Sequence, residues 1–159
     1  DTQSEKSEKS EPIKSKVSLR KVAVKPPPLI RGNGKKQGRG LVKTWKQRYF
    51  VLDAGILSYY ESAIDIYPFG MDKRGDIALT TYSAALSHNV RKNAQHQSDT
   101  AATPADSTAV TFSSTELKEH FVIVLDNIST NYDGKYTNNG DVWFNHLTAH
   151  IEYARMMNL

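Results

Sequence analysis

Residues 45–60 carry the pattern that most constrains the fold of this chain. Residues 45–52 are rich in aromatic and β-branched side chains, as is typical of a strand. Residues 53–55 form a short turn signal that includes Gly55, and residues 56–60 form a second strand-like run. Two such runs on either side of a short glycine turn predict an antiparallel hairpin. The chain therefore has to be built, at least in part, as a β-sheet.

Weaker strand signals follow this hairpin. A third strand is expected at residues 76–80, after a break at residues 70–75, and a weaker one at residues 82–90. Shorter candidates lie at residues 110–112, 121–125 and 135–137. Apolar runs such as residues 121–125 are far shorter than the ~20 residues that cross a bilayer. Any contact with a membrane is therefore expected to be peripheral.

The hydrophobic period changes in the last part of the chain. Trp143, Leu147, Ile151 and Ala154 recur at helical spacing and predict one stripe of an amphipathic helix. Asn139 or Asp141 is a candidate N-cap. A set of strands followed by one terminal helix indicates an antiparallel sheet closed by that helix.

The 159 residues suit one folded domain with flanking and inserted segments. Residues 1–26 form a polar, then basic leader that we expect to be disordered, and residues 27–159 form the domain. Residues 32–40, with four glycines, are expected to be a flexible loop. Residues 91–108 are expected to be a mobile insertion. The absence of cysteine excludes disulfides and thiol chemistry and fits a cytoplasmic location.

The charge of the chain is strongly asymmetric. Residues 14–48 contain twelve Lys or Arg residues and no Asp or Glu, although the whole chain has a formal net charge of only +4. Such asymmetry favours an anionic partner: a membrane surface, a phosphorylated head group or a nucleic acid.

The second half of this basic run lies on a predicted strand. Residues two apart share one face of a strand, so Lys46 and Arg48 point the same way, and Phe50 and Leu52 continue that face into a core. The simplest interpretation is a solvated sheet face. The presence of a hairpin, a glycine loop and a terminal Trp helix in this order favours a phosphate pocket instead. In such a pocket Arg offers planar paired donors and Lys a mobile charge.

These segments resemble the pleckstrin homology (PH) domain. Residues 38–52 and 57–61 are similar to the first half of that family, residues 74–79 to its next strand, and Trp143 with Leu147 to its C-terminal helix. The resemblance implies a mainly β fold: a partly open sandwich or barrel of about seven antiparallel strands, capped by one C-terminal α-helix. Two departures stand out: the expected first strand, residues 27–31, is rich in proline, and the last part of the sheet is short and rich in Asn.

The resemblance also implies a set of residues that bind head groups. Lys46 and Arg48 match the [Lys/Arg]-x-Arg pattern of the family's second strand, and Arg31, Lys35 or Lys36 can supply its Lys near the first loop. Tyr59 and Arg74 match positions that contact phosphates. The complete expected set is Arg31, Lys35, Lys36, Arg39, Lys43, Lys46, Arg48, Tyr59 and Arg74.

The other motifs in the sequence give only weak indications of function. Residues 32–38 lack the ending of a nucleotide-binding P-loop and the helix that should follow it. His146 and His150 are four apart on the helix but have no third ligand in view, so we interpret them as flanking positions of that helix and expect no metal. The glycosylation sequon at Asn127 has meaning only in a secreted chain. No nucleophile and base stand together, so we expect neither an enzyme nor a cofactor.

Three functional hypotheses follow. The first is a monomeric, peripheral membrane-recruitment module that binds anionic phospholipids, with a phosphoinositide favoured and phosphatidic acid possible. The alternative is an adaptor that binds a protein partner without specific lipid binding. The third, nucleic-acid binding, is disfavoured because Trp45, Tyr49 and Tyr59 belong to strand pairing and not to an exposed stacking platform.

Overall fold

The computed structural model describes residues 23–38, 40–90, 106–138 and 142–159. Within these residues the chain forms eight strands followed by one helix. The strands are β1 (Ile30–Gln37), β2 (Trp45–Asp53), β3 (Ile56–Ala63), β4 (Gly70–Ala78), β5 (Ser83–Val90), β6 (Asp106–Ser114), β7 (Glu119–Asn131) and β8 (Tyr136–Asn138). The helix is α1 (Val142–Met157).

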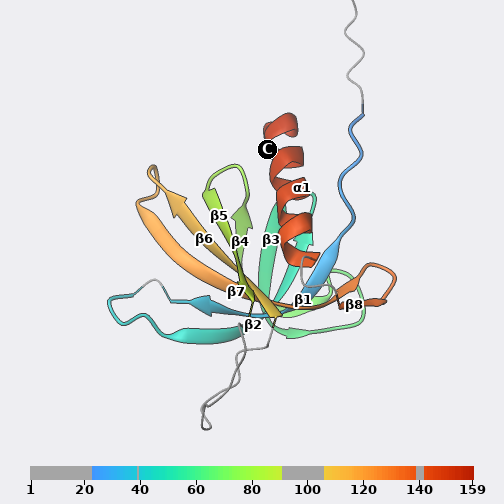
Figure 1. Cartoon of the computed structure of the whole chain (residues 1–159), viewed down its shortest axis with the longest axis horizontal. Helices are drawn as coiled ribbons and strands as arrows, with labels where there is room; N and C mark the ends of the chain where they lie inside the picture. Colours follow the sequence, from blue (N-terminus) through green and yellow to red (C-terminus); the bar gives the residue numbers. More distant parts are fainter. Residues whose placement is uncertain (1–22, 39, 91–105, 139–141) are drawn as a thin grey trace, which may run out of the picture.

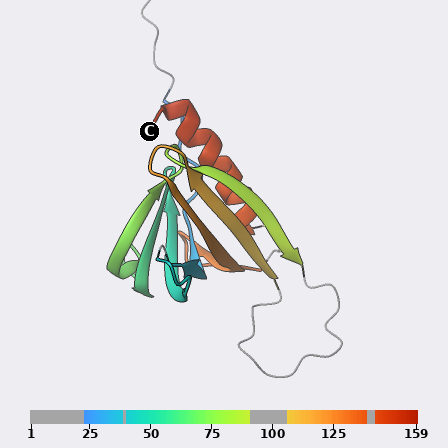
Figure 2. The ribbon, with the colours of Figure 1, turned by 90° about the vertical axis from the view of Figure 1, so that its left-hand side faces the viewer.

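The strands form one open antiparallel sheet in the order β4-β3-β2-β1-β7-β6-β5, and β8 pairs with β7. The sheet bends so that its two halves face each other, and α1 lies over one opening between them (Figures 1 and 2). The helix contacts β2, β5 and β7. This is the PH-like architecture expected from the sequence, and the expected fold class is confirmed.

The core lies between the two halves of the sheet and the helix. Phe50 and Leu52 are fully buried there, as the alternation along β2 predicts, and Trp143 and Leu147 close the core from α1. The helical stripe expected from the sequence is therefore the buried face of α1, although Ile151 is only partly covered. The expected capping residues, Asn139 and Asp141, lie outside the described residues.

A second, smaller cluster covers the outer face of the first half of the sheet. Its buried members are Leu29, Tyr49, Val51, Tyr60 and Phe69. Tyr49 and Val51 alternate with the core residues of β2, so this half of the sheet is apolar on both faces. We refer to the two sides of the sheet below as the inner face, toward the core, and the outer face.

The prediction of a flexible loop at residues 32–40 is wrong for most of that segment. Residues 32–37 belong to β1, and the connection to β2 begins only at Gly38. A Cβ atom at Gly34 would lie 2.5 Å from the carbonyl oxygen of Val124 and 3.0 Å from the ring of Phe50. The pairing of β1 with β7 also shifts between Gly32 and Gly34. These glycines serve close packing and an irregular pairing rather than a turn.

The starts of β4 and β6 also differ from those expected. β4 begins at Gly70 and not after a break at residues 70–75, and its pairing with β3 shifts between Tyr59 and Tyr60. Residues 106–108, expected to be part of the insertion, pair with β5 and β7 as the start of β6. The proline-rich entry does delay β1, which starts at Ile30. Most of the expected leader and insertion lies outside the described residues.

Candidate functional site

The register between β1 and β2 places three cations on the inner face, at the end of the sandwich away from the β2–β3 turn. Lys36 lies opposite Lys46, and Arg48 lies opposite Gly34. Continuing along this face, Gly32 lies opposite Phe50 and Ile30 opposite Leu52, in the core. The inner face is therefore charged at this end of the sandwich, which we call the mouth, and apolar deeper in, as the alternation along β2 predicts.

Lys36 is buried although it carries a charge. Its ammonium group lies 4.4 Å from the ring centroid of Phe121 and 5.4 Å from that of Tyr59, and it donates a hydrogen bond to the carbonyl oxygen of Gln37 at 3.1 Å. Aromatic ring faces attract cations, which compensates for part of the lost hydration. The rings of Tyr59 and Phe121 thus connect the core to the ammonium group of Lys36 at the mouth.

Arg48 and Arg74 are held by one carboxylate. Arg48 Nη1 donates to Glu61 Oε2 at 3.1 Å and to the carbonyl oxygen of Gln47 at 2.7 Å. Arg74 Nη2 forms an ion pair with Glu61 Oε1 at 2.6 Å. Arg74 is the extra residue in the irregular pairing of β3 with β4, where Tyr59 faces Gly75 and Tyr60 faces Lys73. A bulge of this kind redirects a side chain, and here Arg74 reaches a carboxylate on the neighbouring strand.

Tyr59 forms the floor between these cations and the core. Its ring lies 6.2 Å from that of Phe50, and a Cβ atom at Gly75 would lie 2.6 Å from its hydroxyl oxygen. The side chain therefore needs glycine opposite it on β4. We call the following group of inner-face residues the basic site: Lys36, Lys46, Arg48, Tyr59, Glu61 and Arg74.

The connection from β1 to β2 lies beside the basic site and ends in an apolar tip. It closes with a hydrogen bond from the amide of Gly38 to the carbonyl oxygen of Thr44 at 2.8 Å. Leu41 is fully exposed, and Val42 and Lys43 are also exposed. Arg39 lies outside the described residues. The tip therefore presents two adjacent aliphatic side chains beside Lys43.

Two of the expected head-group residues do not join the basic site, because they lie on the outer face. Arg31 is buried over the ring of Phe69, 4.1 Å from its centroid, and donates to the carbonyl oxygen of Ile64 at 3.3 Å. Lys35 faces Gln47 on β2 and Val124 on β7. Burial raises the pKa of Asp126, and the charge of Lys35 opposes that rise.

Reasoning from the sequence missed Glu61 and the apolar tip. Glu61 follows Tyr59 by two residues on the same strand, so strand alternation places this carboxylate on the same face as Tyr59, which the family resemblance had assigned to the site. No separate role was predicted for Leu41 and Val42. Two adjacent aliphatic residues between Gly40 and Lys43 were the signal for an exposed tip.

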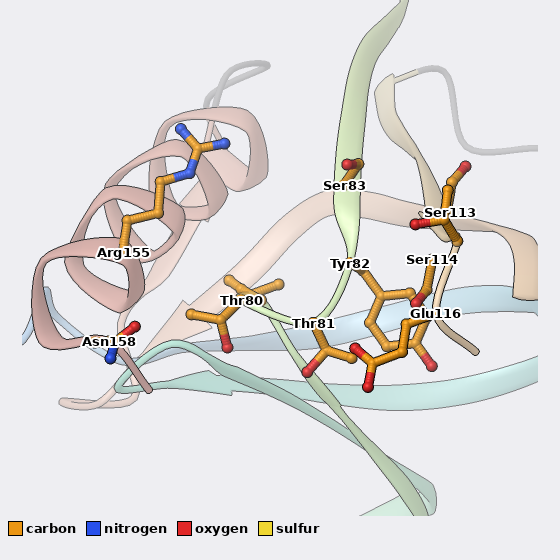
Figure 3. A pocket seen from close by; sticks show the side chains of 11 residues that line it. Thr80, Thr81, Tyr82, Ser83, Ser113, Ser114, Glu116, Arg155 and Asn158 are labelled. Atoms are coloured by element: carbon orange, nitrogen blue, oxygen red, sulfur yellow. The ribbon is translucent and has the colours of Figure 1, made fainter. Parts of the chain in front are cut away.

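A polar pocket of about 470 Å³ lies at another place in the sandwich (Figure 3). It is formed by the end of α1, the β4–β5 connection and the β6–β7 turn, and hydroxyl groups dominate its lining. Several of these groups are already engaged: Thr80 donates to the carbonyl oxygen of Leu159, and Ser114 accepts from the amide of Leu117. None of the expected head-group residues lines it, so this pocket and the basic site are separate.

His150 does not occupy a flanking position of the helix, as the sequence suggested, but is fully buried. Its Nδ1 accepts a hydrogen bond from the amide of Gly55 at 3.1 Å, so Nε2 carries the proton and donates to the carbonyl oxygen of Pro28 at 3.1 Å. Nδ1 of His146 lies 3.2 Å from the same oxygen. Burial lowers the pKa of both histidines. Among the residues described by the structure, no group of three or more His, Asp or Glu is placed to hold a metal ion.

No helix in the described part of the chain is long and apolar enough to cross a membrane.

No family model matches the sequence, and no curated protein matches it. Among solved structures, the PH domain of Slm1 is similar over 77% of this chain and 94% of its own, with 12% identity and a TM-score of 0.43. The PH domain of human pleckstrin homology domain-containing protein family A member 5 is similar over 94% and 93%, with 20% identity and a TM-score of 0.43. Likeness at this level assigns no ligand to the chain.

Proposed function

We propose that this chain is a membrane-recruitment module whose basic site binds the phosphorylated head group of an anionic phospholipid, with a phosphoinositide as the favoured ligand and phosphatidic acid as a less selective one. The observation that carries the proposal is the convergence of Lys36, Lys46, Arg48 and Arg74 from three segments of the sheet on one open mouth.

The chemistry of these side chains suits phosphate. A guanidinium group presents parallel donors to two phosphate oxygens, and an ammonium group adds a compact charge. The side chain of Arg48 is only 13% exposed, so its interaction with an anion is screened less by water than that of a fully exposed arginine.

The apolar tip supports a membrane as the source of the phosphate. Leu41 and Val42 project beside the same mouth that holds the cations. A surface that combines aliphatic side chains with lysines fits the boundary between head groups and acyl chains, where the lysines remain at the phosphates. The basic leader adds diffuse attraction, at about 1 kcal/mol for each Lys or Arg near an anionic surface.

Sedimentation with vesicles tests the proposal. Phosphatidylcholine vesicles that contain a phosphoinositide should carry the wild-type protein into the pellet, and the Arg48→Ala and Lys46→Ala variants should lose most of this binding. The Lys73→Ala variant is the matched control, because Lys73 lies on the outer face and pairs with Asp76 at 2.7 Å. Undiminished binding by a folded Arg48→Ala/Lys46→Ala variant would contradict the assignment of the site.

One observation favours the adaptor as a second candidate. An open groove of about 700 Å³ on the outer side is lined by Pro26, Pro28, Leu29 and the exposed rings of Tyr67 and Tyr132. If the chain acts through this groove, a Tyr67→Ser/Tyr132→Ser variant should lose its protein partner while Arg48→Ala keeps it. Nucleic-acid binding gains less support: Trp45 is 48% exposed, contrary to the expectation, but Tyr49 is buried and Tyr59 packs against Phe50, so the three rings do not form a stacking platform.

A further inference from the structure

The basic site contains a carboxylate at its centre. Glu61 lies on β3, two residues after Tyr59, and each of its two carboxylate oxygens pairs with a different arginine: Oε2 with Arg48 and Oε1 with Arg74. Both arginines are among the groups to which we assign phosphate binding. An incoming phosphate must therefore take the place of this carboxylate, or share the arginines with it.

We propose that Glu61 is an internal counter-ion that competes with the ligand and so sets how many phosphates a head group needs in order to bind. This inference rests on the proposed function and concerns the selectivity of the same site. Without a ligand, Glu61 satisfies the donors of Arg48 and Arg74. With a ligand, its negative charge stays in the site and opposes the phosphate.

The competition favours ligands with several phosphates. A single phosphate gains two arginines only by displacing Glu61, so its net gain is small. A head group with two or more phosphates can place one at the arginines and another near Lys46, which lies farther along the same face of β2. The penalty from Glu61 is then offset by contacts that it does not affect. Arranging an opposing charge against weaker ligands is a general route to specificity.

The alternative role for Glu61 is positional: its two ion pairs hold the arginines in the orientation that binds phosphate. The two roles predict opposite results when the charge is removed. Folding does not depend strongly on this charge in either case, because the Glu61 side chain is 35% exposed and exposed ion pairs contribute little to stability. A neutral variant is therefore expected to fold and to report on binding.

The experiment compares Glu61→Gln with a matched control, Asp76→Asn. The control removes the same charge from the adjacent strand, but Asp76 lies near the outer face, where it pairs with Lys73 and accepts a hydrogen bond from Ser58 at 2.5 Å. The probes are phosphatidylcholine vesicles that contain phosphatidic acid, a phosphatidylinositol monophosphate or a phosphatidylinositol trisphosphate, at equal total surface charge. Melting temperatures verify folding, and Glu61→Ala provides a second neutral variant.

We expect Glu61→Gln to bind the phosphatidic acid and monophosphate vesicles about threefold to tenfold more tightly than wild type, which corresponds to about 0.7 to 1.4 kcal/mol. The gain for the trisphosphate should be smaller, Asp76→Asn should stay within about twofold of wild type, and the gain should vanish in an Arg48→Ala background. Unchanged or weaker binding by both neutral variants, or an equal gain in Asp76→Asn, would overturn the counter-ion role while leaving the proposed function intact. No binding of any vesicle by wild type or Glu61→Gln would overturn the proposed function, and this inference with it.

Discussion

At Gly34 the backbone of β1 comes closer to its neighbours than a side chain would allow. The space beside its Cα is filled by the Val124 carbonyl on β7 and the ring of Phe50 on β2. Arg48 lies opposite Gly34 on β2. The residue that seemed to be part of a flexible loop is therefore a packing position that borders the basic site.

The Gly34→Ala variant should be destabilised by about 1 to 3 kcal/mol, because a methyl group would force the carbonyl or the ring to move. Urea unfolding measures the loss. The Gly40→Ala variant is the control: a Cβ atom there would have its nearest contact at 4.0 Å, so its stability should change little. Equal stability of the two variants would contradict the packing role of Gly34.

Among the elements, the connection between β1 and β2 adds a contact that the strands cannot provide. It is held at its base by Gly38 and Thr44 and exposes Leu41 and Val42 beyond the sheet. The basic site recognises charge, whereas this tip offers apolar surface. The two parts differ in what they should respond to: binding through the site weakens with salt, and binding through the tip does not.

The Leu41→Ser/Val42→Ser variant should bind anionic vesicles about tenfold more weakly than wild type, because burying an aliphatic side chain is worth about 1.5 to 3 kcal/mol and only part of each is expected to enter the membrane. Its affinity for a soluble inositol phosphate should be unchanged. Calorimetry with the soluble ligand and sedimentation with vesicles separate the two effects. Parallel losses in both assays would show that the tip acts on the shape of the site.

In the whole molecule, buried His150 joins three parts of the chain that are distant in sequence. It connects α1 to the β2–β3 turn at Gly55 and to the carbonyl oxygen of Pro28 before β1. This arrangement requires a neutral imidazole, because protonation of Nδ1 would place a donor against the Gly55 amide. Burial lowers the pKa of His150, the bond to Pro28 and the charge of Asp53 oppose that shift, and His146 adds to it.

This arrangement predicts a pH-dependent stability. The pKa of His150 is lower in the folded state than in the unfolded state, so the unfolded chain binds more protons below about pH 6.5. The contribution of His150 should be complete above that pH and should decrease as the pH falls toward the folded-state pKa. Urea unfolding between pH 7.5 and 5 measures this, with His150→Gln as the control, since the amide keeps a donor and an acceptor but does not titrate. An identical slope for His150→Gln and wild type would contradict the assignment.

Local patterns in the sequence predicted much of this fold for identifiable reasons. The alternation in β2 placed Lys46, Arg48 and Phe50 on one face, and the helical period of Trp143 and Leu147 placed α1 on the core. Both depend on neighbours within one element. The boundaries of β1 and β4 were wrong because glycine, normally a signal for a turn, is placed there by close packing against other strands.

The sequence by itself determined the order of the elements, the apolar face of each and the concentration of positive charge before and within the first hairpin. Only the tertiary structure decided which charges meet. Lys36 faces inward and Lys35 outward because of the pairing between β1 and β2, and a shift of one residue would exchange them. The bulge that brings Arg74 to Glu61 also depends on pairing with another strand. Such pairing is non-local, which is why the basic charge was visible in the sequence but the sharing of one carboxylate by Arg48 and Arg74 was not.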